Sequence, residues 1–356
     1  MRRLAVAATG IAVASLALVP VASAATKTVT MGTPTKNQKA LIALGADVDD
    51  FFPHGVKIHV GDSVRFVPSG FHDVDLPKKG AKAQPLFITG GPISGSLDAA
   101  GNPFWFNGQP SVGFNPAVAG ANNFGKRLTY TGAKTIISGL PLAAHPKPMT
   151  VKFTKAGKYT YYCDVHPGMK GTVRVVAKSR RIPTTAQDKA AVKAQIARAI
   201  RIAKTLGKAA PPANTVLIGN AGAHGVEFFG FLPQTLTVPT GTVVTFKMPV
   251  GSKETHTATT GPGNPESEPN SYLGKLTASL ESPQPDPAAV YPSDPPPNPA
   301  AFTASSHGNG FWNSGALDSV SASPLPAANA VKFNAPGTYQ FYCLIHPFMH
   351  GTLVVQ

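Results

Sequence analysis

Two short runs of the chain bring sulfur and nitrogen side chains together. They read Cys163-Asp-Val-His166-Pro-Gly-Met169 and Cys343-Leu-Ile-His346-Pro-Phe-Met349, and they contain both cysteines of the 356-residue sequence. A thiolate, an imidazole and a thioether so close in sequence suit copper and disfavour Mg²⁺, Ca²⁺ or Mn²⁺, which prefer oxygen ligands. Two cysteines are too few for a disulfide scaffold. The spacing therefore predicts a metal centre in each run.

One further histidine in each half of the chain completes a ligand set. His72 and His256 each follow directly after an expected first hairpin. Two imidazoles and a thiolate with a weak axial methionine form a trigonal type 1 copper site. The alternative for a single run is a buried cysteine, a surface histidine and a core methionine, but recurrence in register argues against coincidence. We expect two copper sites, with the ligands His72, Cys163, His166 and Met169, and His256, Cys343, His346 and Met349.

The two runs belong to a longer internal repeat. They align without a gap at an offset of 180, which also pairs Val151-Lys-Phe153 with Val331-Lys-Phe333. Each copy begins with alternating apolar residues around a glycine turn, at 56–66 and 236–246, and ends with an aromatic strand and a valine-rich strand. This pattern predicts short antiparallel strands in a β-sandwich, and the period is too long for a solenoid. The expected fold is all-β, with two tandem Greek-key β-sandwiches.

Four regions follow from these boundaries: a signal peptide at 1–24, a first domain at 25–178, a helical linker at 179–212 and a second domain at 213–356. The signal peptide is indicated by Arg2 and Arg3, an apolar run, and Ala22-Ser-Ala24 as a cleavage site. An uncleaved anchor is the alternative. No other stretch approaches the roughly 20 apolar residues of a membrane span. We therefore expect a soluble protein outside the cytoplasm, secreted or in the cell envelope or periplasm.

The linker should form one amphipathic helix. Thr184 and Gln187 form a capping box, and Val192, Ile196 and Ala199 begin an apolar stripe at helical spacing. The segment 178–208 carries nine Lys or Arg and one Asp, a net +8 out of +15 for the chain. We expect the stripe to pack on one domain, with binding of a membrane surface as the alternative. Because the charge is local and the protein is exported, nucleic-acid binding is disfavoured.

Each domain also contains a long Gly- and Pro-rich excursion before its closing motif. The second has eight prolines between Pro283 and Pro299, which predicts an extended and mobile segment instead of a packed element. Both tryptophans, Trp105 and Trp312, lie in the excursions. We expect them to pin each excursion to its sandwich, with a partner-docking platform as the alternative.

The repeated ligand runs resemble those of the cupredoxins, in the plastocyanin/amicyanin branch. Two residues separate His from Met in each loop, as in the amicyanin type, and a Gly-Thr-Leu-Val-Val strand follows the second loop. The resemblance implies that the loop histidines, His166 and His346, emerge through an apolar patch and serve as electron ports, with Pro167, Pro347 and Phe348 in the patch. Family members often have Asn beside the first histidine, where this chain has Asp73 and Thr257.

The function expected from this resemblance is electron transfer, with one copper site in each domain and an unidentified redox partner protein. The alternatives are a copper-binding or storage protein of the envelope and a two-domain copper oxidoreductase of the nitrite-reductase type. The chain has no His-x-His pair of the kind that multicopper oxidases use. A catalytic second copper would need the remaining histidines, which are scattered singly: His54, His59, His145, His224, His307 and His350. We therefore favour a carrier over an enzyme.

Overall fold

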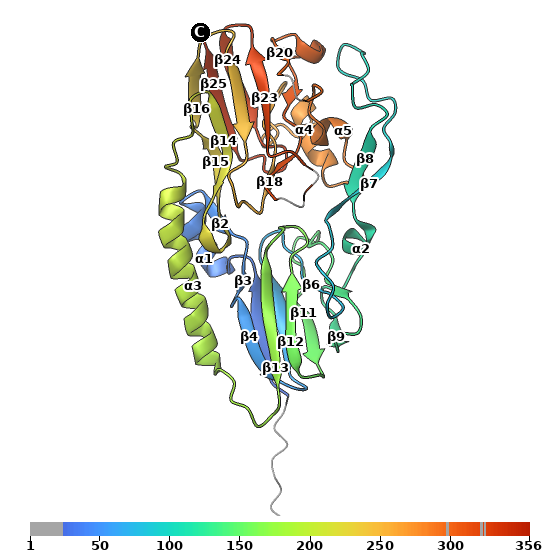
Figure 1. Ribbon diagram of the computed structural model, residues 1–356, viewed down its shortest axis with the longest axis vertical. Helices are drawn as coiled ribbons and strands as arrows, with labels where there is room; N and C mark the ends of the chain where they lie inside the picture. The colour runs from blue at the N-terminus through green and yellow to red at the C-terminus, as the bar shows by residue number, and fades with distance from the viewer. Residues whose placement is uncertain (1–23, 297–298, 321–322, 324) are drawn as a thin grey trace, which may run out of the picture.

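The structure is a computed structural model that describes residues 24–296, 299–320, 323 and 325–356. Within these ranges most strands form two β-sandwiches, one above the other, with a long helix along one side (Figure 1). The expected all-β fold with a helical linker is confirmed. Residues 1–23 of the predicted signal peptide lie outside the described residues. No helix in the described ranges combines the length and hydrophobicity needed to cross a bilayer.

The N-terminal sandwich consists of two five-stranded sheets. The first runs in the order β3 (Phe51–Phe52), β1 (Thr26–Met31), β5 (Ser63–Pro68), β11 (Met149–Phe153) and β9 (Arg127–Tyr130). The second runs in the order β10 (Ile136–Ile137), β6 (Asp75–Leu76), β12 (Gly157–Tyr162), β13 (Lys170–Val176) and β4 (Gly55–His59). Alternate residues of β13, including Val173 and Val175, are buried against Val64 and Phe66 of the facing sheet. The period-two pattern therefore forms one core between the sheets.

The C-terminal sandwich repeats this plan with a larger first sheet. That sheet runs in the order β2 (Ala46–Val48), β15 (Val226–Leu232), β14 (Thr215–Ala221), β17 (Val243–Lys247), β23 (Ala328–Phe333) and β20 (Ala301–Phe302). The facing sheet runs in the order β16 (Thr235–Val238), β25 (His350–Val355), β24 (Gly337–Tyr342), β19 (Thr259–Thr260) and β21 (Trp312–Asn313). A short pair, β18 (Thr255–His256) with β22 (Leu317–Asp318), stands beside it.

The expected pairing of the early strands is wrong. We expected β4 and β5 to form an antiparallel hairpin, but β4 pairs with β13 and β5 pairs with β1 and β11 in the facing sheet. The turn between them, in which Gly61 has φ 92°, carries the chain from one sheet to the other. Both sandwiches are mixed, because β1–β5, β4–β13, β14–β17 and β16–β25 are parallel pairs. Parallel neighbours need long connections, which the excursions and sheet crossings supply.

One strand from the N-terminal part of the chain belongs to the C-terminal sandwich. Strand β2 pairs antiparallel with β15, so that Asp47 lies opposite Glu227. The Asp49 amide extends this pairing by donating to the Gly225 carbonyl at 2.7 Å. Strand β2 thus joins the N-terminal part of the chain to the edge of the C-terminal sandwich. This pairing fixes how the facing ends of the two sandwiches meet.

The linker helix packs over the joint, the place where β2 pairs with β15. Helix α3 (Thr185–Leu206) begins with the predicted capping box of Thr184 and Gln187. Its apolar stripe packs on β2, β15 and α1 (Thr35–Ile42), and the buried members are Ile196, Ala199, Ala203 and Leu206. The expected packing of the stripe is confirmed, although the surface that it covers is built from both halves of the chain.

The two excursions pack on each other. In the first, the hairpin β7 (Phe87–Pro92) and β8 (Pro110–Phe114) precedes helix α2 (Pro116–Ala119) and lies beside the upper sandwich (Figure 1). The second contains α4 (Tyr272–Ser279), α5 (Pro287–Val290) and a 3₁₀ turn at Ser306–Gly308. Another 3₁₀ turn, Ala223–Gly225, lies between β14 and β15. Phe104 and Phe106 pack with residues of α4 and α5 in one buried cluster.

This cluster corrects two expectations about the excursions. Part of the proline-rich segment is a packed helix, α5, whose Ala288 and Ala289 are buried. Trp105 donates its indole N–H to the Pro292 carbonyl at 2.8 Å, so it joins the first excursion to the second instead of to its own sandwich. Trp312 lies in the core of the C-terminal sandwich as expected.

Candidate metal centres

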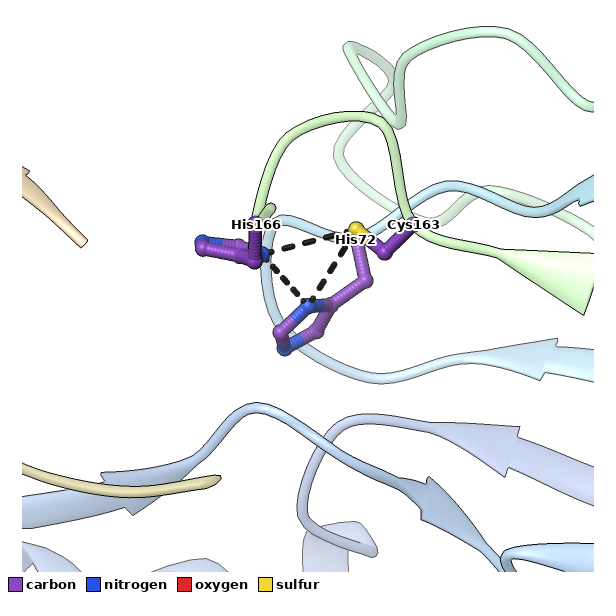
Figure 2. A group of neighbouring side chains, drawn as sticks. All are labelled: His72, Cys163 and His166. Atoms are coloured by element: carbon purple, nitrogen blue, oxygen red, sulfur yellow. Dashed lines mark hydrogen bonds between the residues drawn. The ribbon is translucent and has the colours of Figure 1, made fainter. Parts of the chain in front are cut away.

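The structure brings three of the four predicted ligands of the first site together. His72 follows β5, Cys163 follows β12 directly, and His166 lies in the loop that leads to β13 (Figure 2). The Nδ1 atoms of the two histidines are 2.9 Å apart, and the Cys163 Sγ lies 3.9 Å from Nδ1 of His72 and 3.5 Å from Nδ1 of His166. All three residues are buried.

The second site has the same construction. Nδ1 of His256 and Nδ1 of His346 are 3.0 Å apart, and the Cys343 Sγ lies 3.6 Å and 3.8 Å from them. His256 comes from β18, whereas Cys343 and His346 lie in the loop between β24 and β25. The predicted ligand residues therefore converge in both halves of the chain, through the same atoms.

These two triangles fit a small metal ion. In each, one point lies about 2 Å from all three donor atoms, the distance at which first-row metals bind imidazole nitrogen. A thiolate with two neutral imidazoles in a trigonal set is the donor combination of blue copper. Met169 and Met349, the predicted axial ligands, are 1% exposed and belong to the same buried clusters as Cys163 and Cys343.

The ligand loops are held by matching backbone hydrogen bonds. The amide of Cys163 donates to the carbonyl of Met169 at 3.0 Å, and the amide of Met169 donates to the carbonyl of His166 at 3.0 Å. The corresponding distances in the second loop are 3.1 Å and 2.8 Å. Since these bonds close each loop on itself, the cysteine and histidine are fixed before any ion binds.

Comparisons with known proteins agree with this geometry. Residues 127–176 match the copper-binding plastocyanin/azurin family. Both sandwiches have the cupredoxin fold. A 27-residue stretch is 63% identical to amicyanin-alpha of Methylorubrum extorquens, covering 8% of this chain and 23% of that protein. The chain thus aligns with less than a quarter of the length of this curated relative.

Solved cupredoxin structures align with part of the chain. The purple cupredoxin of Nitrosopumilus maritimus is 15% identical over 40% of this chain and 98% of its own, with a TM-score of 0.21. The oxidised plastocyanin of Dryopteris crassirhizoma is 22% identical over 40% of this chain and 99% of its own, with a TM-score of 0.20. Each of these solved chains covers less than half of the present one.

The side chains that support the ligands differ between the two cupredoxin units. In the first, Asp73 Oδ1 accepts a hydrogen bond from the amide of Asp164 at 2.7 Å. In the second, Thr257 Oγ1 accepts one from the amide of Leu344 at 2.9 Å. These residues occupy equivalent positions, so the resemblance correctly drew attention to Asp73 and Thr257. A hydroxyl and a carboxylate perform the same positioning role with different charge.

Two pairs of supporting residues were missed by the sequence reasoning. Gly32 and Gly219 have φ of 84° and 78°, and each lies against the ring of the first histidine of its site, His72 or His256. Ser138 and Ser314 accept from the amides of Val74 and Ala258 at 2.9 Å and 2.8 Å, which anchors the strand beyond that histidine. The Ser-Gly dipeptide at both serines was the available signal.

Burial controls the protonation of the two cysteines and of His256 when no metal is bound, whereas the neighbouring Asp49 and Glu254 outweigh burial at His166 and raise its pKa. Burial raises the pKa of the Cys163 and Cys343 thiols to about 11, so both cysteines carry a proton at neutral pH. Burial, followed by the neighbouring His346, lowers the pKa of His256 to about 3, which leaves a neutral imidazole. A thiolate ligand must lose its proton, so metal binding at these sites releases protons and is pH-dependent.

The two loop histidines differ in exposure, and one expectation fails. His166 is only 7% exposed, because the C-terminal sandwich covers it, so it is no surface electron port. The side chain of His346 is 20% exposed. Phe229 and Phe348 lie 5.2 Å and 6.0 Å from the His346 ring, and Phe348 is 51% exposed. The expected apolar patch therefore exists at the second site.

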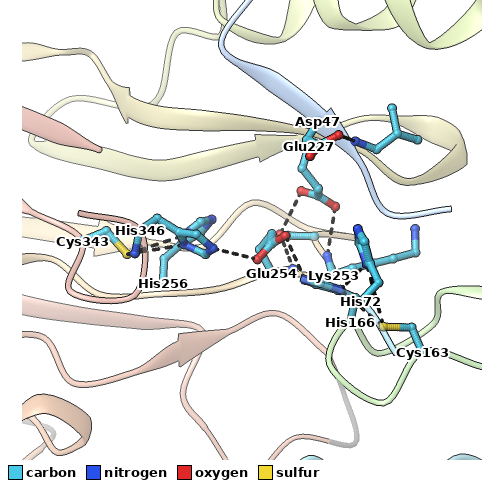
Figure 3. A network of polar contacts seen from close by, with 12 residues as sticks. Asp47, His72, Cys163, His166, Glu227, Lys253, Glu254, His256, Cys343 and His346 are labelled. Carbon is cyan, nitrogen blue, oxygen red and sulfur yellow. Dashed lines mark hydrogen bonds and ion pairs between the residues drawn. The ribbon is translucent and has the colours of Figure 1, made fainter. Parts of the chain in front are cut away.

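A buried carboxylate lies between the two sites. Glu254 Oε1 is 3.3 Å from Nε2 of His166, and Glu254 Oε2 is 3.4 Å from Nε2 of His346 (Figure 3). Burial alone would raise the pKa of this carboxyl, but the charge and hydrogen bond of His166 outweigh it and lower the pKa. The sequence reasoning missed Glu254, because nothing in its local pattern shows that the sandwiches meet there.

The remaining histidines do not gather into a further cluster in the described part of the chain. His54 contacts Asp50 at 2.7 Å, and His307 contacts Asp98 at 3.6 Å. His224 lies 3.5 Å from Arg198 on the linker helix. One other group of possible ligands occurs in the described residues, formed by Asp49, His166 and Glu254 at the joint.

Proposed function

We propose that this chain is an extracytoplasmic electron carrier with one type 1 copper site in each cupredoxin unit. The observation that carries the proposal is the pair of congruent Nδ1–Nδ1–Sγ triangles, buried in two separate sandwiches. Bound copper would supply a one-electron Cu(II)/Cu(I) couple. The fold supplies ligands that need little movement when the charge of the ion changes, which favours fast electron transfer.

Each residue has a defined part in this function. Cys163 and Cys343 would provide the thiolates, and the Nδ1 atoms of the histidines would donate their lone pairs to the same ion. The self-closed ligand loops and the buried surroundings exclude water and fix the donors. Met169 and Met349 lie in the same clusters and are the proposed axial ligands.

Electron exchange with a partner would occur at the second site. Its loop histidine is partly exposed and is flanked by the exposed Phe348, which suits brief apolar docking of a redox protein. The leader with Arg2, Arg3 and Ala22-Ser-Ala24 supports export to the envelope or beyond. The basic helix α3 offers a further charged surface for association with a membrane or an acidic partner.

The test is to load the full chain with copper and measure metal content, optical absorption and electron paramagnetic resonance. The carrier predicts two coppers per chain, intense thiolate-to-copper absorption and reversible reduction. A colourless copper-loaded protein would instead indicate storage and would overturn the proposal. The second candidate function is a copper oxidoreductase, favoured by the Asp49, His166 and Glu254 group at the joint. It predicts an additional type 2 copper signal.

A further inference from the structure

The facing ends of the two cupredoxin units meet at a single shared carboxylate. Glu254 lies between the outward nitrogens of His166 and His346, one oxygen toward each (Figure 3). It is 5% exposed, and His166 is 7% exposed. Both histidines direct their other nitrogen, Nδ1, to the cysteine of their own site. One side chain therefore contacts a predicted ligand of each site.

We propose that Glu254 couples the two copper sites into one redox unit, by accepting the Nε2–H of His166 and the Nε2–H of His346 at the same time. This inference rests on the proposed electron-carrier function and adds to it a residue and a route. The first site would then exchange electrons through the second, and not directly with a partner. Glu254 acts as a positioning residue, since it touches the ligands and not the ion.

The two contacts fix the tautomer of both imidazoles. A carboxylate only accepts hydrogen bonds, so each Nε2 facing Glu254 must carry the proton. When a metal ion is bound, the lone pair of each imidazole would then be on Nδ1, the nitrogen that faces the thiol in each site. A carboxylate on the outer nitrogen of a metal-bound histidine orients the ring and makes it a stronger ligand. Here one carboxylate does this for two sites.

Glu227 holds the backbone next to Glu254 in place. Glu227 on β15 accepts from the amide of Lys253 at 3.0 Å and from Ser252 Oγ at 3.0 Å, and Ser252 Oγ in turn accepts from the amide of Glu254 at 3.1 Å. Strand β15 is also the strand that pairs with β2. The loop that carries the carboxylate is thus tied to the edge where the sandwiches join, so the bridge depends on their fixed arrangement.

The same arrangement provides a route for an electron. It runs from Cys163 and His166 through Glu254 to His346 and Cys343, inside a region that excludes water. With copper bound at both sites, one electron passing along it would oxidise the donor site from Cu(I) to Cu(II) and reduce the acceptor site from Cu(II) to Cu(I). No proton is transferred, because both Nε2–H bonds persist. The external electron comes from the redox partner named in the proposed function.

The first experiment measures copper affinity at each site in the full chain with Glu254→Ala and Glu254→Gln. Loss of the carboxylate in Glu254→Ala should weaken both sites by about 10–100-fold, as for other partners of metal-bound histidines. Glutamine has one accepting oxygen, so Glu254→Gln should weaken one site more than the other. The control Asp318→Asn alters another buried carboxylate of the same sandwich that hydrogen-bonds the amide of Val320, and it should leave both affinities unchanged.

The second measurement begins with a variant that leaves Glu254 in place, so its first result does not depend on how Glu254 variants fold. In the wild-type background, Cys163→Ala should shift the reduction potential of the Cys343 site, because coupling between sites is reciprocal. In the Glu254→Ala background, Cys163→Ala should no longer shift the reduction potential of the Cys343 site. This is the result that a double-mutant cycle gives when the coupling has been removed. Photoreduction of one site should be followed by re-equilibration with the other, more slowly in Glu254→Ala.

The outcomes separate this inference from the proposed function. If the wild-type protein has two blue copper centres but Glu254→Ala weakens one or neither, the bridge is wrong while the carrier stands. A third metal ion in each chain that is lost in Asp49→Asn also overturns the bridge, since His166 Nε2 would then bind metal and have no proton. A colourless protein overturns the carrier and, with it, this inference.

Discussion

The two proposed copper sites of this chain have the same donors but different surroundings. Beside the first lie the buried carboxyl groups of Asp73, Asp75 and Asp164, whereas Thr257, Thr259 and Leu344 occupy the equivalent positions beside the second. Strand pairing shows the equivalence directly, because Tyr162 lies opposite Asp75 and Tyr342 lies opposite Thr259. The candidate ligands are therefore the same at both sites, while the ionisable groups around them differ.

The two sites also differ in their access to solvent. The first is enclosed by the C-terminal sandwich, and the second keeps a partly exposed histidine beside Phe348. Negative charge near copper favours Cu(II), but burial raises the pKa of Asp75 to about 7 and that of Asp164 to about 9. These carboxyl groups should therefore lower the potential of the first site relative to the second only as the pH rises and they ionise. The comparison suggests that an enclosed low-potential site supplies electrons to an accessible high-potential site.

The largest expected effect is the loss of one site at a time. Cys163→Ala should remove one copper and one thiolate-to-copper band, and Cys343→Ala should remove the other, because each thiolate serves a single triangle. Difference spectra against wild type then give the spectrum of each site separately. Measured metal content is the check, and removal of both centres or of neither by one substitution would contradict two independent ligand sets.

The next comparison concerns the glycines that accommodate the first histidines. In Gly32→Ala the new methyl group would overlap the His72 ring and the Ser69 carbonyl, so the first site should lose copper. In Gly219→Ala the methyl group would lie 3.1 Å from Nε2 of His256, which is tight but tolerable. We expect that variant to keep copper and to lose about 1–2 kcal/mol of stability from its left-handed conformation.

Copper content and urea unfolding distinguish these two glycine variants. If Gly32→Ala and Gly219→Ala retained the same amount of copper and were equally stable, the space around His72 and His256 would not differ as the packing indicates. Both glycines have positive φ, 84° and 78°, so the backbone cost is common to both and only the overlap differs. The contrast therefore isolates the effect of space around the ring.

Local pattern predicted much of each site. Cys163, His166 and Met169 lie in one loop, so spacing alone placed them together, and repetition at a fixed offset made the second set equally visible. His72 and His256 could be selected because they follow an alternating apolar segment. Strand periodicity also predicted which faces are buried, as in β13.

Features that depend on how distant segments meet were not predictable. The pairing of β2 with β15 and the bridge at Glu254 arise from contacts between the sandwiches, which leave no periodic trace. The crossing between sheets at Gly61 looks like a hairpin turn in sequence, since both use a glycine with positive φ. The composition of the proline-rich segment predicts an extended chain. The structure instead has a short helix there, in which Ala288 and Ala289 are buried against the other excursion.

Exchange of the supporting residues tests whether charge separates the two potentials. Asp73→Thr keeps an acceptor for the amide of Asp164, as Thr257 does for Leu344, while removing a carboxyl group. It should raise the potential of the first site and change the free energy of unfolding by no more than about 1.5 kcal/mol. Thr257→Asp should lower the potential of the second. Spectroelectrochemistry in the Cys343→Ala and Cys163→Ala backgrounds, respectively, measures each site alone, and unchanged potentials would exclude charge as the cause.

The smallest expected effect is a pH dependence confined to the N-terminal sandwich. Burial, with a contribution from the charge of Asp73, raises the pKa of Asp75 from 3.8 to about 7. Between pH 4 and pH 7 the folded protein keeps this proton and the unfolded chain has lost it, so the free energy of unfolding should fall as pH rises through that window and become level above it. Thr259 cannot titrate in this range. Urea unfolding of the metal-free protein at a series of pH values should show the slope in wild type and a smaller slope in Asp75→Asn, and parallel curves for the two proteins would rule out Asp75 as its source.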